Sequence, residues 1–237
     1  GKGIRLKNFV SDGVEQLVIE SFLENTSYGT LSNKNSKISV VSAHSGGQPF
    51  MGHFTYALSE YLNANYISVE KSSQSNFIPK YKLDIRKQPS YLNLNESENE
   101  LVNDFKNDLL STIKEKSIVI YFVTGTKGKG NFHLLNGGSS GTDDFITENS
   151  LFEPVDKLRT FKKELEKAYL EIDPESVIKT HQRYGNEDKE EFQWMLKREK
   201  NANILCIYVT AKLLNSKADV YYPSIKCIGD TIKNELF

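Results

Sequence analysis

Cysteine is scarce in this sequence, and it has no long apolar run and no excess of charge of either sign. The two cysteines among 237 residues, Cys206 and Cys227, exclude a disulfide framework, and they do not form a Cys-x-x-Cys pair. We interpret both as core thiols, which fits a reducing compartment. No stretch approaches the ~20 apolar residues of a membrane-spanning helix, and no apolar leader opens the chain. We therefore expect a cytoplasmic protein with no membrane partner.

The charges almost cancel. Lys and Arg number 30 against 31 Asp and Glu, for a net charge of -1. Nothing in this balance draws the chain to nucleic acid, so we expect no nucleic-acid partner. Hydrophobic residues make up 38% of the chain, which is enough for a real core and excludes wholesale disorder. The expected partner is a small-molecule substrate, and the oligomeric state is left open.

Short apolar runs alternate with amphipathic stretches. Strands are predicted at residues 38–43, 66–70, 117–123 and 204–210, with a short one at 176–179. Helices are predicted at residues 54–62, 98–114, 156–171 and 189–200, and from Pro223 onward. Residues 14–23 have near-helical spacing, although Val18 and Ile19 alternatively form a short strand. Residues 25–37 read as a loop.

This order of elements predicts the fold class. A strand, a helix and a second strand within residues 38–70 are typical of a βαβ unit, whose two strands are parallel. The continued alternation predicts an α/β protein, with residues 1–237 as a single three-layer domain around a mostly parallel central sheet. Residues 1–36 are expected to be an N-terminal extension, and residues 71–97 and 124–150 to be long loops.

A candidate site follows the strand at residues 38–43. His44 comes directly after it, and Ser45 and Gly46 come next. Open α/β sheets bind ligands outside the carboxyl ends of their strands. A histidine there gives a fixed imidazole to a metal or acts as a base, and small neighbours leave room for water and substrate. The alternative is a hydrogen-bonded histidine in a tight turn.

Three segments carry a family resemblance. Residues 40–46, Val-Val-Ser-Ala-His-Ser-Gly, resemble the opening motif of the N-formylglutamate amidohydrolase family. Residues 81–86, Tyr-Lys-Leu-Asp-Ile-Arg, are similar to the Asp-Leu-Asn-Arg segment of that family. Residues 180–185, Thr-His-Gln-Arg-Tyr-Gly, resemble its later Arg-His-Tyr-Gly turn. The order of elements also agrees over residues 39–236.

The resemblance implies a fold, an activity and a set of residues. That family is understood as zinc-dependent amidohydrolases with a carboxypeptidase-like, or phosphorylase/hydrolase-like, α/β fold. It implies a hydrolase that acts on an amide bond of a small carboxylate-bearing substrate. By this resemblance His44 would be a zinc ligand, while Arg86 and Arg183 would hold the substrate carboxylates. We further expect Asp84 and His181 to act with His44 in catalysis, and Ser45 and Gly46 to contact the substrate.

The later metal ligands of that family have no matching residues here. The third predicted strand is followed by Thr124 and Gly125, and residues 207–210 contain no Glu. A zinc site needs three protein ligands, so Asp84, His133, Asp143 or Glu70 would have to complete it. The alternative is a catalytically degenerate relative that binds a small anion.

A glycine-rich segment supports a different prediction. Residues 125–130, Gly-Thr-Lys-Gly-Lys-Gly, resemble the phosphate loop of folylpolyglutamate synthetases. Backbone N–H groups and lysines in such a loop can hold phosphate. The usual Ser or Thr and the helix are replaced by Asn131 and Phe132. Phosphate or nucleotide binding through residues 125–130 is therefore an alternative, alongside a basic surface loop.

Overall fold

The computed structural model describes residues 3–11, 15–43, 45, 50–70, 96–125, 130–136, 150–181 and 192–237. The strands in this part of the chain are β1 (Gly3–Ser11), β2 (Glu15–Asn25), β3 (Gly29–Ser32), β4 (Ile38–Ser42), β5 (Asn65–Val69), β6 (Ile118–Gly125), β7 (Phe132–Leu135), β8 (Thr180–His181) and β9 (Asn203–Thr210). The helices are α1 (Met51–Tyr61), α2 (Glu96–Thr112), α3 (Val155–Tyr169), α4 (Phe192–Lys200), α5 (Ala211–Leu214) and α6 (Ala218–Leu236).

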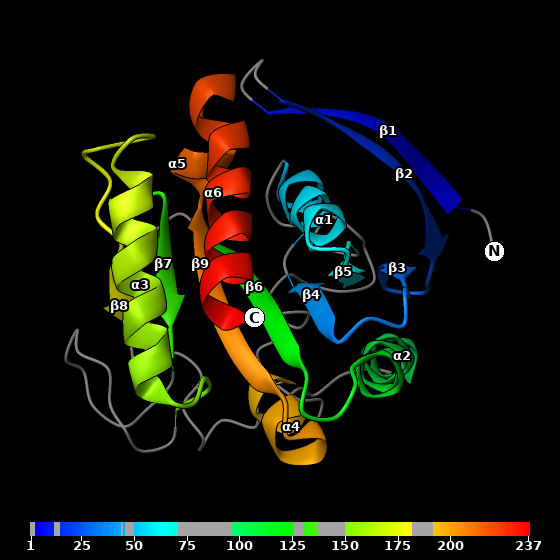
Figure 1. The fold of residues 1–237 in the computed structure, drawn as a ribbon. Coiled ribbons are helices and arrows are strands. Elements are labelled where there is room, and N and C mark those ends of the chain that lie inside the picture. The colour runs from blue at the N-terminus through cyan, green and yellow to red at the C-terminus, as the bar shows by residue number, and fades with distance from the viewer. Residues whose placement is uncertain are drawn as a thin grey trace.

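These strands form one sheet in the order β1-β2-β3-β5-β4-β6-β9-β7-β8 (Figure 1). The four central strands, β5, β4, β6 and β9, are parallel to one another. On one side β1, β2 and β3 pair antiparallel, and on the other β7 pairs antiparallel with β9. The prediction of an α/β fold is confirmed, but the sheet is mixed and not mostly parallel. Strands joined by a short connection, such as β1 and β2, can pair only as an antiparallel hairpin.

The central elements lie where the sequence predicts them, and the differences concern the margins. The helical spacing of residues 14–23 does not give a helix at residues 15–23, because β2 pairs along its length with β1. The predicted loop at residues 25–37 contains β3, and residues 124–150 contain β7. The short strand expected at residues 176–179 falls instead at β8. The last helix begins at Ala218, so Pro223 lies inside it and does not start it.

Helices cover both faces of the sheet and give three layers. One apolar cluster joins the sheet to α1, α3, α5 and α6, and the other joins the opposite face to α2 and α4. Neighbouring residues of a strand enter different clusters, as Val40 and Val41 of β4 do. Both side chains are fully buried, which is why the central strands read as continuous apolar runs.

The connections of β4 define a topological switch point. From β4 the chain passes through α1 to β5 on one side, and it later returns through α2 to β6 on the other side of β4. The two helices therefore lie on opposite faces of the sheet, as the two apolar clusters show. A crevice outside the carboxyl ends of β4 and β6 is the place where such sheets bind ligands.

Gly29 tests how closely β3 approaches the carboxyl end of β5. Gly29 pairs with Val69, and a Cβ at Gly29 would lie 2.1 Å from the Ser68 carbonyl oxygen and 2.7 Å from the Glu70 nitrogen. We expect Gly29→Ala to lower the free energy of unfolding by about 3 kcal/mol, the upper end of the usual cost of overpacking. The added Cβ would collide with backbone atoms of β5, which cannot move away without breaking the pairing of β3 with β5. Urea denaturation measures this change.

The matched control is Gly52→Ala in α1. There the nearest atom to an added Cβ is the Ser45 Cβ, at 3.6 Å, so the methyl group has room. This variant should be as stable as the wild type or slightly more stable, since alanine favours a helix by about 0.5–1 kcal/mol over glycine. Equal destabilisation by the two substitutions would contradict the close approach at Gly29.

Candidate functional site

The carboxyl end of β4 is fixed by both neighbouring strands. Ser42, its last residue, lies opposite Ser68 of β5 and Phe122 of β6. Just beyond the strand, the Ala43 nitrogen still donates to the Phe122 carbonyl oxygen at 3.1 Å. Ser42 and Ser68 are fully buried, so their hydroxyls need protein partners.

Three serines supply those partners to one another, and we call them the hydroxyl clasp: Ser42, Ser45 and Ser68. The Ser68 hydroxyl donates to Ser45 Oγ at 2.6 Å, and Ser45 Oγ lies 2.6 Å from Ser42 Oγ. Because Ser45 accepts from Ser68, its own proton is available for Ser42. The clasp therefore ties the turn after β4 to the end of β5.

A second polar contact set anchors the first turn of α1 beside the clasp. The Tyr66 hydroxyl of β5 donates to the Gly52 carbonyl oxygen at 3.1 Å and lies 2.8 Å from Thr55 Oγ1. Thr55 Oγ1 in turn donates to the Met51 carbonyl oxygen at 2.8 Å. Burial raises the pKa of Tyr66, so its phenol stays neutral and acts as a hydrogen-bond donor.

Glu70 follows β5 at the same end of the sheet, next to the carboxyl end of β4. Its Oε1 accepts a hydrogen bond from Thr30 Oγ1 of β3 at 3.2 Å. The residue as a whole is exposed, but burial of the carboxyl group raises its pKa, against the opposite effect of the Thr30 hydrogen bond. A carboxylate with a perturbed pKa beside a strand end is a candidate functional group.

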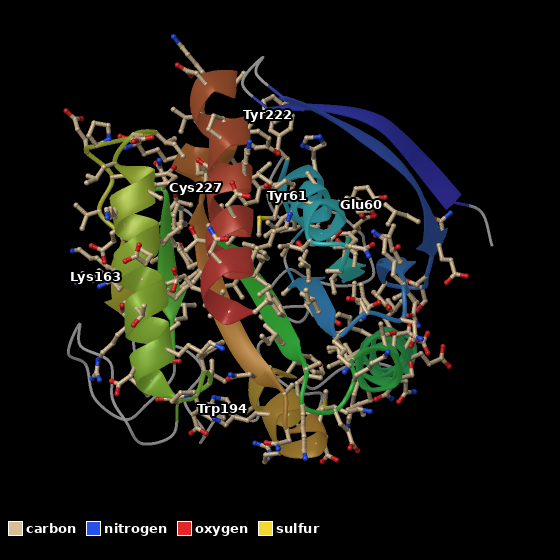
Figure 2. The ribbon with its side chains drawn as sticks, in the orientation of Figure 1. Glu60, Tyr61, Lys163, Trp194, Tyr222 and Cys227 are labelled. Atoms are coloured by element: carbon tan, nitrogen blue, oxygen red, sulfur yellow. The ribbon has the colours of Figure 1, made fainter. Side chains whose placement is uncertain are left out.

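An aromatic cluster lies between the starts of α1 and α6. His53 Nδ1 lies 2.8 Å from the Tyr221 hydroxyl, which donates to the Phe50 carbonyl oxygen at 3.3 Å. Tyr222 meets the His53 ring edge-on, and Figure 2 shows it at the upper end of α6. Phe50 has a φ of 65° and its side chain is 61% exposed. A positive φ is unusual for so bulky a residue and is often found near functional sites.

The predicted site residues are described only in part. Ser45 lies in the hydroxyl clasp. His44, Gly46, Asp84, Arg86 and Arg183 fall outside the described residues, and their roles stay predictions. Ala43 and Ser45, the two neighbours of His44 in the sequence, lie at the carboxyl end of β4.

The backbone of His181 belongs to β8, at the edge of the sheet. Four strand spacings separate β8 from β4, which is a lateral distance of about 19 Å at ~4.8 Å per strand. The position of its imidazole is not described. The backbone positions therefore do not bring His181 beside β4.

Two residues of the glycine-rich region have structural partners. His133 is buried in β7, three strands from β4, and its Nδ1 accepts from the Lys179 nitrogen at 3.1 Å. A Cβ at Gly130 would lie 2.5 Å from the Val177 carbonyl oxygen, so close packing accounts for this glycine. The Thr210 hydroxyl also donates to the Gly130 carbonyl oxygen at 2.8 Å. Residues 126–129, with both lysines of the segment, fall outside the described part.

Sequence reasoning missed two members of the clasp. Ser42 and Ser68 are unremarkable in the sequence, because a serine at the end of an apolar run is also common in turns. The signal that identifies them is their opposition in the β4–β5 register, which becomes visible only once the parallel pairing is known. The sequence indicates Glu70 only as a substitute metal ligand.

Among the described residues, no group of three or more His, Cys, Asp or Glu side chains is arranged to hold a metal ion. Around the carboxyl ends of β4 and β5, the side chains of the described residues supply one carboxylate, that of Glu70, and otherwise hydroxyl groups. Zinc prefers thiolate, imidazole and carboxylate ligands, so these residues alone do not make a zinc site. In the same part of the chain, no helix has the length and apolar character that crossing a membrane requires.

The sequence matches no protein-family model and no curated protein. Solved structures show weak likenesses. A metallo-carboxypeptidase from Burkholderia cenocepacia is 9% identical with a TM-score of 0.49, over 84% of this chain and 56% of its own. A zinc-free structure of YNDL is 12% identical with a TM-score of 0.49, over 90% and 91% of the two chains.

A succinylglutamate desuccinylase from Chromobacterium violaceum is 10% identical with a TM-score of 0.44, over 83% of this chain and 59% of its own. The chain thus spans just over half the length of the carboxypeptidase and of the desuccinylase. At these identities, and with TM-scores below 0.5, the likenesses do not establish a shared site or activity.

The first prediction for this site concerns the hydroxyl clasp. Ser68→Ala removes the donor to Ser45 and should lower the free energy of unfolding by about 1 kcal/mol, the usual net value of one hydrogen bond. Urea denaturation measures the change. Ser111→Ala is the control, because the Ser111 hydroxyl bonds its own helix at an exposed position, and it should be nearly neutral. Identical stabilities for the two variants would refute the clasp.

The second prediction concerns pH. Burial lowers the pKa of His53, so the unfolded chain binds the proton more readily than the folded protein. The corresponding stability is complete above the unfolded value of ~6.5 and is lost as the pH falls below it. His53→Asn keeps a donor towards Tyr221 without titrating. Thermal unfolding between pH 7.5 and 5.5 should therefore show a smaller stability loss in the variant, and equal losses would contradict this assignment.

Proposed function

We propose that the protein is a hydrolase-like enzyme that acts on an amide bond of a small carboxylate-bearing substrate, resembling the N-formylglutamate amidohydrolases. One observation carries this proposal. Ala43 and Ser45, the neighbours of the predicted catalytic residue His44, lie at the carboxyl end of β4, at the switch point of the sheet. The motif that suggested the family therefore coincides with the place where this topology binds ligands.

The roles follow the resemblance residue by residue. His44 acts as metal ligand or base, and Asp84 assists it in catalysis. The predicted site also includes His181, but its backbone lies in β8, four strand positions from β4, so His181 would have to act from across the sheet. Ser45 and Gly46 contact the substrate, and Arg86 and Arg183 hold its carboxylates. The structural support is for Ser45, because hydrogen bonds from two buried strands orient its hydroxyl before any ligand arrives.

Zinc belongs to this proposal only through residues outside the described part. The metal would polarise the amide carbonyl and activate a water molecule. Since the described residues at the β4 edge do not form a zinc site, we assign no reaction step to the metal. His44 is the proposed ligand, and metal content is a direct test of it.

Two alternative functions would use residues near the same strand ends. A catalytically degenerate relative would bind a small anion there without turnover. A phosphate or nucleotide binder would use residues 125–130, which follow β6, the neighbour of β4 at the switch point. Packing accounts for Gly130, so this glycine needs no phosphate to explain it.

The test combines metal analysis with an activity assay. The purified protein should contain about one zinc per chain and hydrolyse N-formyl or N-acyl derivatives of acidic amino acids. His44→Ala should lose the zinc and at least about 100-fold in activity, because even changes around metal ligands cost 10–100-fold. Mass spectrometry of bound metal and a discontinuous amine assay measure both.

The matched control is His53→Asn, which removes a histidine that is paired with Tyr221. It should keep both zinc and activity. Absence of zinc together with anion binding but no turnover would replace the hydrolase with the degenerate relative. Unchanged turnover in His44→Ala would exclude His44 from catalysis.

A further inference from the structure

The chain enters α1 through a residue in an unusual conformation. Phe50 directly precedes the helix and has a φ of 65°, in the left-handed region that bulky side chains rarely adopt. Its side chain is exposed, so burial of the ring does not account for this conformation. Such a conformation persists only where neighbouring groups fix the backbone. The groups that fix Phe50 therefore control how the chain passes from β4 into α1.

Tyr221 of α6 contacts the backbone of this residue. Its hydroxyl donates to the Phe50 carbonyl oxygen at 3.3 Å, and the same oxygen accepts a helical hydrogen bond from the Phe54 nitrogen at 2.8 Å. A phenol has one proton, so His53 Nδ1, which lies 2.8 Å from the Tyr221 oxygen, is the donor in that second contact. The phenol proton is thus directed at Phe50.

The ring of Tyr221 is held in place by the first turn of α1. It is buried, it stacks on the His53 ring with centroids 5.9 Å apart, and it meets the Phe54 ring edge-on at 5.5 Å. Aromatic pairs attract one another in both of these arrangements. The hydroxyl therefore stays at the Phe50 carbonyl oxygen without depending on that one hydrogen bond.

The start of α1 also lies close to the hydroxyl clasp. The nearest atom to a Cβ built on Gly52 is the Ser45 Cβ, at 3.6 Å. From β5, the Tyr66 hydroxyl donates to the Gly52 carbonyl oxygen at 3.1 Å. The connection between β4 and α1, which contains the predicted site residues His44 and Ser45, therefore has one end fixed by the clasp and the other end fixed at Phe50.

We propose that Tyr221 is a positioning residue for the candidate site. Its hydroxyl holds Phe50 in the left-handed conformation and so fixes the first turn of α1 against Ser45. Tyr221 acts through Phe50 and is not itself a catalytic residue. The consequence for catalysis rests on the proposed function, whereas the effect on the backbone does not.

Amide hydrogen exchange followed by NMR tests the effect on the backbone. Tyr221→Phe keeps the ring and removes only the hydroxyl. The Phe54 amide, bonded to the Phe50 carbonyl oxygen, should then exchange about fivefold faster, the ratio that corresponds to the usual net value of one hydrogen bond. The Leu62 amide, bonded to the Leu58 carbonyl oxygen at the other end of α1, should change by less than about twofold.

The matched control is Tyr61→Phe. The Tyr61 hydroxyl donates to Asp230, so this variant also removes one phenol hydrogen bond between α1 and α6, but at the end of α1 away from Phe50. Figure 2 labels Tyr61 where the two helices meet. This variant should speed the exchange of the Leu62 amide and leave that of the Phe54 amide within about twofold of the wild type.

A change at Phe50 separates positioning from simple packing. Asn occupies the left-handed region much more readily than Phe, and little burial is lost when the exposed Phe50 ring is removed. In Tyr221→Phe/Phe50→Asn, the Phe54 amide should therefore exchange within about twofold of its rate in Phe50→Asn alone. A mere loss of packing between α1 and α6 would persist in the double variant.

The same variants test the consequence for catalysis. In the proposed hydrolase, Tyr221→Phe should lower kcat roughly fivefold and leave KM within twofold, because the arginines proposed to hold the substrate belong to other segments. Tyr61→Phe should change neither constant.

Equal acceleration of the Phe54 amide in Tyr221→Phe and Tyr61→Phe, or acceleration that persists in the double variant, would overturn the proposal. An unchanged kcat of Tyr221→Phe in an active enzyme would also overturn it. A wild-type protein without hydrolase activity would contradict the proposed function alone, because the exchange rates would still decide the role of Tyr221.

Discussion

The parallel pairing of β4 with β5 on one side and β6 on the other is the constraint on which the rest of the structure depends. Both edges of β4 are hydrogen-bonded, and its consecutive side chains enter the two separate apolar clusters. A shift of one residue would move Val40 and Val41 to the wrong faces, so the register cannot slip. The carboxyl end of β4, and with it the turn that follows, is therefore held in a fixed position relative to β5 and β6.

The polar groups near the carboxyl end of β4 are the hydroxyl clasp and the Glu70 carboxylate. The hydroxyl clasp satisfies buried serines and joins the turn to β5, so it stabilises the fold. Glu70 follows β5 at the same end of the sheet, where burial of its carboxyl group raises its pKa and Thr30 donates a hydrogen bond to it.

The central part of the fold was predictable because it depends on local pattern. The apolar runs at β4, β5, β6 and β9 and the amphipathic periods of α1, α2 and α3 are strong signals that tertiary contacts reinforce. The margins were not predictable in the same way. β2 has an ambiguous apolar spacing that only its pairing with β1 resolves, and β3 and β7 lie in polar or glycine-rich segments.

The candidate site divides along the same line. His44 and Ser45 are visible as a motif after an apolar strand, so the position of Ser45 just beyond the carboxyl end of β4 could be predicted from residues alone. The hydrogen bond between Ser45 and Ser68 joins residues 23 positions apart, and no sequence spacing encodes it. The same holds for His53 and Tyr221, which are separated by 168 positions.

By itself, the sequence determined the α/β class, the central βαβ unit and the place of the histidine turn. These follow from hydrophobic period, turn chemistry and the geometry of strand ends. Only the tertiary structure decided the mixed sheet, the hydroxyl clasp and the hydrogen bond between Thr30 and Glu70. Each of these depends on which strands become neighbours, and strand order is set by the burial of both sheet faces together, not by any one segment.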